Sequence, residues 1–266
     1  MSGRDARFCV RLNFEICALL PFAGSIPKEL GDLTKLEQLA LNNNHLTGTI
    51  PAELGKLEAL KMLDLEHNKL SGHIPPQLGQ LGALQYLSLS LNKLDGHIPP
   101  ELGALSELRV LWLNGNKLTG LIPKELGELR RLEKLVLYSN NLTGPIPSDL
   151  GHLSALKELY LQANQLSGPI PEELGALLRL EKLWLYSNNL TVFPRAVAER
   201  FAAQDIRLIT EDNPWMEPPA DVLKMGLAYA ASFLKDLEDF GRTSSNRLKV
   251  VQFSFLDTFP FFPQVC

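Results

Sequence analysis

Leucines recur along this chain at a constant interval of 24 residues. The first leucines of successive units are Leu36, Leu60, Leu84, Leu108, Leu132, Leu156 and Leu180. In the same register an asparagine follows each of them, then in most units a glycine and an Ile-Pro pair, so that the unit is LxxLxLxxNxLxGxIPxxLGxLxx. A constant period of this size is typical of a solenoid of stacked coils, because a single unit cannot bury its own apolar face.

Each part of the unit predicts one part of a coil. The LxL segment alternates apolar and variable positions, as in Leu135, Val136 and Leu137, and this predicts a short strand with one buried face. We expect the asparagine to bond through its amide to the backbone of the adjoining turn. The glycine permits a positive φ or a close approach between coils, and Ile-Pro predicts an extended return path. Stacked coils align their strands into one parallel sheet on a concave face.

Two thirteen-residue segments, 131–143 and 179–191, are identical except that Val136 becomes Trp184. Both residues occupy the fifth position of LxxLxLxxN. The third, fifth, seventh and eighth positions point away from the leucines into the concave space. At the fifth and seventh positions, aromatic residues accumulate toward the C-terminal half, and these are the candidate binding residues: Trp112, Tyr138, Tyr160, Trp184 and Tyr186. Exposed Trp and Tyr on a rigid sheet are typical of binding hot spots. The alternative is that these rings stack across strands and only stiffen the sheet.

This pattern resembles the leucine-rich repeat family, and its LxGxIPxxLGxL half is similar to the plant-type subclass. The resemblance covers about residues 24–194. It implies an α/β fold, a right-handed leucine-rich repeat solenoid with short parallel strands on the concave face. It also implies that the ligand on this face is a protein or a peptide.

The chain divides into four predicted segments. Residues 1–35 hold a degenerate N-terminal segment and a half repeat, and residues 36–193 hold seven repeats. A helical C-terminal cap is expected over residues 194–240, with helices over 194–203 and 219–240 and an irregular strand near 207–210 between them. Residues 241–266 are a linker and a tail outside the repeats.

Residues 213–237, NPWMEPPADVLKMGLAYAASFLKDL, resemble the segment that closes the repeats in ROCO-type proteins, where a GTPase domain follows. The pentamer RLKVV at 247–251 resembles the first strand of such a domain, although it also fits a chance match. A phosphate loop GxxxxGK(S/T) should come next, but the chain continues QFSFLDTFPFFPQVC, so no nucleotide or other cofactor is predicted. A truncated ROCO-type GTPase stays as an alternative function.

Charge and cysteine usage narrow the partners and the compartment. The net charge is −4 with acids and bases interspersed, so no nucleic-acid partner is expected. Three scattered cysteines favour a reducing, cytoplasmic location, and Arg11 and Glu15 interrupt the apolar core of any signal peptide. No apolar run is long enough to span a membrane. The sequons at Asn141 and Asn189 keep a secreted receptor ectodomain or inhibitor as a second alternative.

Two weaker groupings do not change this picture. His73 and His97 lie one unit apart, but two ligands without a third in register do not predict a metal site. Asp64, Glu66 and His67 fall on one turn of the open sheet, where a solvated polar patch is favoured over acid-base chemistry. The repeats predict a solenoid with no catalytic residues and no metal, and the resemblance to the leucine-rich repeat family implies that it is a protein- or peptide-binding module.

Overall fold

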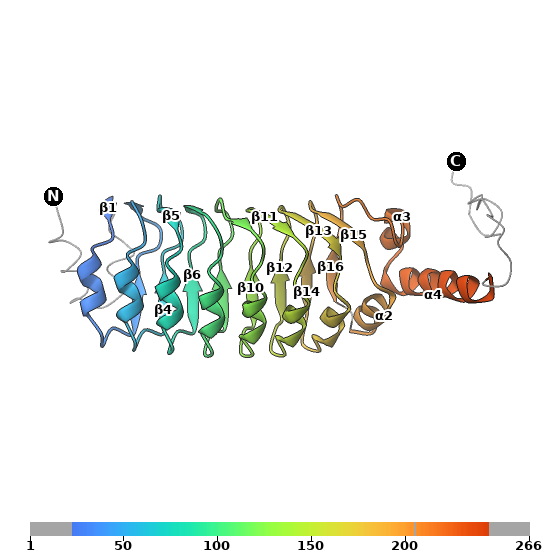
Figure 1. The fold of residues 1–266 in the computed structure, drawn as a ribbon, viewed down its shortest axis with the longest axis horizontal. Coiled ribbons are helices and arrows are strands. Elements are labelled where there is room, and N and C mark those ends of the chain that lie inside the picture. The colour runs from blue at the N-terminus through green and yellow to red at the C-terminus, as the bar shows by residue number, and fades with distance from the viewer. Residues whose placement is uncertain (1–22, 205, 245–266) are drawn as a thin grey trace.

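Each 24-residue unit forms one coil, and the coils stack side by side along the long axis of the molecule (Figure 1). The computed structural model describes residues 23–204 and 206–244. Expectations for residues 1–22 and for the tail, including the RLKVV pentamer, lie outside the described residues.

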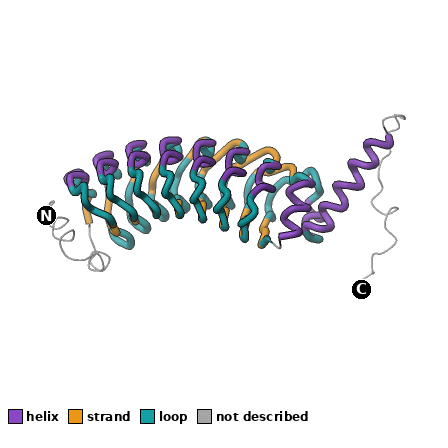
Figure 2. Tube along the Cα trace, turned by 90° about the horizontal axis from the view of Figure 1, so that it is seen from below, coloured by secondary structure: helices purple, strands orange, loops and turns teal. Residues whose placement is uncertain are grey.

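One parallel sheet of eight strands runs the length of the solenoid, and each strand contributes three residues. Its strands are β2 (Gln38–Ala40), β4 (Met62–Asp64), β6 (Tyr86–Ser88), β8 (Val110–Trp112), β10 (Lys134–Val136), β12 (Glu158–Tyr160), β14 (Lys182–Trp184) and β16 (Arg207–Ile209). Figure 2 shows the coils fanned into an arc with this sheet on the inner, concave side. The predicted fold class, a solenoid with parallel strands on its concave face, is confirmed.

The outer side of the arc carries one short 3-10 helix in each coil. These helices are η2 (Lys28–Asp32), η3 (Ala52–Lys56), η4 (Pro76–Gln80), η5 (Pro100–Ala104), η6 (Lys124–Glu128), η7 (Ser148–His152) and η8 (Glu172–Ala176). The predicted extended return path is correct only at the proline that precedes each helix, such as Pro51 at φ −66° and ψ 132°. After it the chain tightens, because the amide of Leu54 bonds the carbonyl of Pro51 at 3.2 Å.

A second set of strands, which the sequence analysis did not predict, runs through the xLxG part of the coils. They form three small parallel sheets: β1 (Ala23–Ser25) with β3 (His45–Thr47); β5 (Ser71–His73) with β7 (Lys93–Asp95); and β9 (Thr119–Gly120), β11 (Asn141–Gly144), β13 (Gln165–Pro169) and β15 (Asn189–Val192) in that order. Within each of these small sheets, neighbouring coils are therefore paired along a second line, separate from the large sheet.

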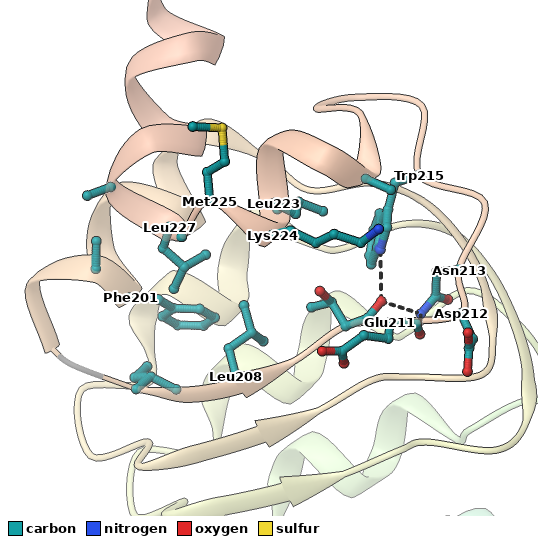
Figure 3. Close-up of a pocket in the computed structure, with 16 residues that line it drawn as sticks. Phe201, Leu208, Glu211, Asp212, Asn213, Trp215, Leu223, Lys224, Met225 and Leu227 are labelled. Atoms are coloured by element: carbon teal, nitrogen blue, oxygen red, sulfur yellow. Dashed lines mark hydrogen bonds between the residues drawn. The ribbon is translucent and has the colours of Figure 1, made fainter. Parts of the chain in front are cut away.

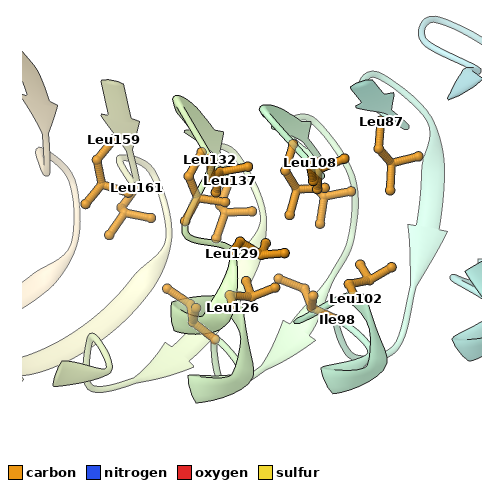
Figure 4. Packing of buried hydrophobic residues seen from close by; sticks show 14 of the residues in the cluster. Leu87, Ile98, Leu102, Leu108, Leu126, Leu129, Leu132, Leu137, Leu159 and Leu161 are labelled. Carbon is orange, nitrogen blue, oxygen red and sulfur yellow. The ribbon is translucent and has the colours of Figure 1, made fainter. Parts of the chain in front are cut away.

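The leucines and isoleucines of the unit fill the interior between the sheet and the 3-10 helices. Figure 4 shows them interdigitating from coil to coil, for example Leu132, Leu137 and Leu159. These three side chains have 0% of their surface exposed. The inward direction predicted for the leucines is thus confirmed.

The repeated asparagine bonds to the backbone of two coils at once. In Asn140 the side-chain Nδ2 donates to the carbonyls of Leu137 at 3.0 Å and of Leu113, in the preceding coil, at 3.1 Å. Its Oδ1 accepts from the amide of Leu118 at 3.1 Å. The same set recurs through the coils to Asn213. The predicted amide bonds are confirmed.

The two glycines of the unit have different roles. The glycine after the asparagine has a positive φ, such as 73° at Gly144, as predicted. The glycine of the LG pair allows close packing instead, because a Cβ built on Gly127 would lie 2.3 Å from the backbone oxygen of Asp149 in the next coil.

Beyond the last full coil the chain forms α2 (Arg195–Gln204), then β16, then α3 (Ala220–Lys224) and α4 (Leu227–Ser244). The single helix expected over 219–240 is wrong, because Gly226 at φ 102° separates α3 from α4. The early turns of α4 contact α2 and bury Ala230 and Leu234, whereas Leu237 is 38% exposed. The rest of α4 leads away from the coils (Figure 1), so this helix covers only part of the end of the solenoid.

We predict that Gly127→Ala destabilises the protein by about 2 kcal/mol, because overpacking against a fixed backbone typically costs about 1–3 kcal/mol. Gly175→Ala is the matched control, since a Cβ there meets no atom within 4 Å, and we expect it to stay within about 0.5 kcal/mol of the wild type. Urea unfolding followed by circular dichroism measures both. Equal midpoints for the two variants would contradict this packing role.

Candidate functional site

The fifth position of the unit forms one continuous row across the concave face. Trp112, Val136, Tyr160 and Trp184 are successive cross-strand partners in β8, β10, β12 and β14. Tyr138 and Tyr186 follow two residues after Val136 and Trp184, on the same face. The five candidate residues Trp112, Tyr138, Tyr160, Trp184 and Tyr186 are called the aromatic face below.

Val136 and Trp184 share this surface, although their exposure differs. Val136 is only 6% exposed, and it does not belong to the hydrophobic core cluster. Its cross-strand neighbours in the row are the larger Trp112 and Tyr160. Val136 is therefore a buried position on the concave face, where the sequence analysis expected an exposed one.

All five rings of the aromatic face are half-buried, and three of them contact another ring. Tyr160 and Trp184 lie with their ring centroids 4.6 Å apart. Trp112 instead meets Tyr86 edge to face, with centroids 5.5 Å apart. Sequence reasoning omitted Tyr86, although it stands at the third position, one of those predicted to point outward. The concave aromatics thus form two ring pairs with Val136 between them.

Ion pairs border the aromatic face along the second position of the unit. Glu133 accepts from Lys157 at 2.7 Å and from Arg109 at 3.0 Å. These hydrogen bonds, from Lys157 first and then Arg109, lower the pKa of Glu133. Glu133 is therefore ionised, and the positive charges of Lys157 and Arg109 balance its negative charge.

The third position repeats the arrangement closer to the rings. Glu158 lies between Lys182 at 3.0 Å and Lys134 at 3.2 Å. Burial works to raise the pKa of Glu158, but hydrogen bonds from Lys182 and Lys134 outweigh it and lower this pKa. The carboxylates of Glu133 and Glu158 beside the aromatic face are thus paired within the protein.

The N-terminal half of the concave face is acidic. Burial raises the pKa of Asp64, although its carboxylate accepts from the amide of Glu66 at 3.1 Å. Burial and the charge of Asp64 raise the pKa of Glu66, while His67 lowers it. Burial and the same carboxylates raise the pKa of Tyr86 to about 12. In the described part of the chain neither carboxylate has an ion-pair partner at 4.0 Å or less.

Four buried polar atoms on the concave face have no hydrogen-bond partner among the described residues. They are Oγ of Ser88, Nε1 of Trp112, Nε1 of Trp184 and Oε1 of Gln162. Gln162 is 2% exposed and stands in the seventh-position row between Tyr138 and Tyr186. An unpaired buried polar group carries a desolvation cost. The polar side chains of this part of the sheet are therefore less completely hydrogen-bonded than the repeated asparagines.

His73 and His97, which lie one unit apart in the sequence, do not belong to a group of three metal ligands among the described residues. Nε2 of His73 lies 3.4 Å from the carboxylate of Asp95, and both side chains are exposed. Across residues 23–204 and 206–244 no three His, Cys, Asp or Glu side chains gather as metal ligands. In the same residues no helix combines the length and apolarity needed to cross a membrane.

Two family models describe the repeats. One, for the leucine rich repeat, matches residues 25–70 and 106–166. A second leucine rich repeat model matches residues 83–105. No curated protein matches the chain.

Several solved structures have the same fold. The chain is similar to a TDR receptor, with 32% identity and a TM-score of 0.66 over 73% of this chain and 38% of that one. It is similar to the leucine-rich repeat ectodomain of the Arabidopsis receptor kinase HAESA, solved with an N-terminally extended IDA peptide hormone, with 35% identity and a TM-score of 0.66 over 73% and 33%. The PEPR1-AtPEP1 structure gives 30% identity and a TM-score of 0.65 over 73% and 31%. The chain thus spans about a third of the length of these proteins.

We predict that Asp64→Asn stabilises the protein at pH 7. Burial raises the pKa of Asp64 in the folded protein above its unfolded value, which is near 4. The free energy of unfolding therefore decreases as the pH rises from the unfolded pKa through the folded pKa. Asparagine is neutral, so the gain should be present at pH 7 and should become small near pH 3, where Asp64 is mostly protonated in the folded and the unfolded state alike. Urea midpoints at both pH values measure this.

The matched control for Asp64→Asn is Asp32→Asn, the same change at an exposed position. It removes a charge that water already solvates, so its midpoint should follow the wild type at both pH values. An Asp64→Asn midpoint at or below that of the wild type at pH 7 would show that burial does not penalise this carboxylate.

Proposed function

The chain is a leucine-rich repeat protein of the plant type, and we propose that it binds an extended peptide, or an extended segment of a protein, on its aromatic face. The observation that carries the proposal is that Trp112, Tyr160 and Trp184 lie in one cross-strand row, interrupted by Val136, on a surface outside the hydrophobic core. Support comes also from the HAESA ectodomain, which was solved with a peptide hormone.

The dimensions of the row suit a short stretch of peptide. Trp112 and Trp184 stand on the first and last of four neighbouring strands, so three strand spacings, about 14 Å, lie between them. An extended peptide covers this distance in about four or five residues. Rings on neighbouring strands give such a peptide a rigid surface, and their own rotamers are already restricted by ring-ring contact, so binding orders few side chains. We therefore expect apolar or aromatic side chains in the bound segment.

The alternative role for these rings is to stiffen the sheet, and the contact between Tyr160 and Trp184 fits both roles. The two roles predict different effects when a ring is removed by mutation. A stiffening pair affects the stability of the protein alone, whereas a binding pair affects affinity by more than the loss of stability explains. Affinity and stability measured on the same variants therefore separate them.

The receptor ectodomains that resemble this chain favour the secreted alternative over the cytoplasmic location expected from its cysteines and its N-terminus. We therefore propose that the repeats act outside the cell. The same comparisons give no support to a ROCO-type GTPase. That this module is not an enzyme stays a prediction.

We expect Trp184→Ala and Tyr160→Ala each to weaken peptide binding by about 30-fold, since a buried aromatic hot spot is worth about 2 kcal/mol or more. The probes are peptides selected from a random twelve-residue display library against the wild type, with affinities measured by calorimetry. Leu178→Ala is the control, because Leu178 is 62% exposed and follows η8 outside the sheet. Unchanged affinity for both ring variants, or no enrichment of any peptide, would contradict the proposal.

Export predicts glycans at two positions. Asn141 and Asn189 begin Asn-Leu-Thr sequons and both side chains are exposed. In protein purified from its natural source, glycosidase release should convert both asparagines to aspartate in tryptic peptides read by mass spectrometry. Unmodified asparagine at both sites would contradict an extracellular location, and it would leave peptide binding to be judged by the affinities alone.

A further inference from the structure

Two carboxylates near the N-terminal end of the concave face have no counter-ion among the described residues. Asp64 and Glu66 stand at the fifth and seventh positions of the coil that contains β4, and both side chains are half-buried. Lys61 belongs to the same coil, but its Nζ lies 2.8 Å from the carboxylate of Glu37. The fold therefore places two negative charges side by side on the concave face without balancing them.

The two carboxylates are fixed in place and still have unused acceptor oxygens. Oδ1 of Asp64 accepts from the amide of Glu66 at 3.1 Å, which holds this carboxylate against the turn. None of the described residues donates a hydrogen bond to Oδ2 of Asp64 or to the carboxylate of Glu66. A carboxylate has about four acceptor sites, so most of this capacity is open to a ligand.

A buried hydroxyl beside Asp64 also has no partner. Ser88, in β6, is the cross-strand partner of Asp64, and both stand at the fifth position, so their side chains project to the same face. Ser88 is 0% exposed, and its Oγ has no hydrogen-bond partner among the described residues. A buried polar atom left unpaired carries a cost. The oxygens at this end of the sheet therefore lack donors.

Aromatic rings border these oxygens on the side toward β8. Trp112 is the other cross-strand partner of Ser88, and it meets Tyr86 edge to face with ring centroids 5.5 Å apart. Burial, and after it the charge of Asp64, raises the pKa of Tyr86, so the phenol lies close to that carboxylate. Carboxylates next to Tyr and Trp rings suit a guanidinium, which donates in its plane and stacks on a ring through its face.

We propose that Asp64 and Glu66 bind the guanidinium group of an arginine in the extended peptide whose other side chains contact the aromatic face. The inference rests on the peptide-binding function proposed above and specifies one residue of the ligand. A guanidinium has five N–H donors and no acceptor, so it supplies what the oxygens of this cluster lack. Its positive charge also balances the two carboxylates.

The position of the acidic pair determines where the arginine falls in the peptide. Asp64 in β4 and Tyr160 in β12 are separated by four strand spacings, about 19 Å, and an extended peptide covers this distance in about six residues. We therefore expect the arginine about six residues from the apolar or aromatic side chain that contacts Tyr160 and Trp184. A twelve-residue peptide is long enough to reach both places.

A second pair of carboxylates at the other end of the sheet provides the matched control. Glu211 follows β16 at the seventh position, as Glu66 follows β4, and Asp212 comes next to it. Both are exposed, and Figure 3 shows them beside a cavity of about 670 Å³ that Lys224 also lines. Asp212 accepts from Ser187 at 3.3 Å. If negative charge alone attracted the arginine, Glu211 would serve as well as Glu66.

Calorimetry with peptides selected from the twelve-residue library against the wild type tests the assignment. Citrulline replaces the arginine of an enriched peptide, because it has a similar shape and no charge. We expect the wild type to bind the citrulline peptide at least about 10-fold more weakly, as for lost hydrogen bonds to a charged group. The double variant Asp64→Asn with Glu66→Gln should bind both peptides equally and at the weaker level. Glu211→Gln should behave as the wild type.

Urea midpoints of all variants verify the fold, and the double variant should be at least as stable as the wild type at pH 7. Equal affinity of the wild type for the two peptides, or enriched peptides without arginine, would overturn the arginine assignment. Such peptides would still report on the aromatic face through Trp184→Ala and Tyr160→Ala. Weaker binding by Glu211→Gln in place of the double variant would also overturn it, and no enrichment of any peptide would overturn both proposals.

Discussion

One buried asparagine in each coil holds together the backbones of two coils, and the solenoid depends on it. Asn140 satisfies groups of its own turn and of the coil before it with a single amide. The residue just before the asparagine adopts a left-handed conformation, as at Ser139 with φ 54° and at Ala163 with φ 53°. For a residue with a Cβ this conformation costs about 1–2 kcal/mol. The bonds of the asparagine offset that cost, and they fix the point at which each strand leaves the sheet.

Because leucine and asparagine determine the coil, the residues between them can vary without changing the fold. The fifth position accepts Asp64, Ser88, Val136 or Trp184 without any change in strand pairing. The concave face therefore changes character along its length, from acidic near β4 to aromatic near β14. In the C-terminal half Glu133 and Glu158 are paired with lysine and arginine. In the N-terminal half burial, together with the charges of Asp64 and Glu66, raises the pKa of Tyr86, and these two carboxylates have no such ion-pair partners among the described residues.

Features that recur in every unit could be predicted from the sequence, and features that depend on one particular neighbour could not. The strands of the large sheet, the asparagine bonds and the positive φ of the glycine after the asparagine follow from residue type and period. The 3-10 helices and the smaller sheets arise only once neighbouring coils are in contact. Val136 is buried by the size of its partners in adjacent strands, which its own segment does not reveal. Gly226 ends α3 within a continuous apolar pattern, because periodicity records which face is buried and carries no information on a single backbone angle.

The uniform register between coils also governs how such a surface changes in size. In the large sheet, residues that face one another are 24 apart, except at the last pair, where Lys182 faces Arg207. A whole unit duplicated between two coils would find the same contacts on both sides, and it would move the flanking rows apart by one strand spacing, about 4.8 Å. The span of the concave face is therefore quantised: duplication or loss of units sets its length in whole steps, and substitution within a unit sets its chemistry.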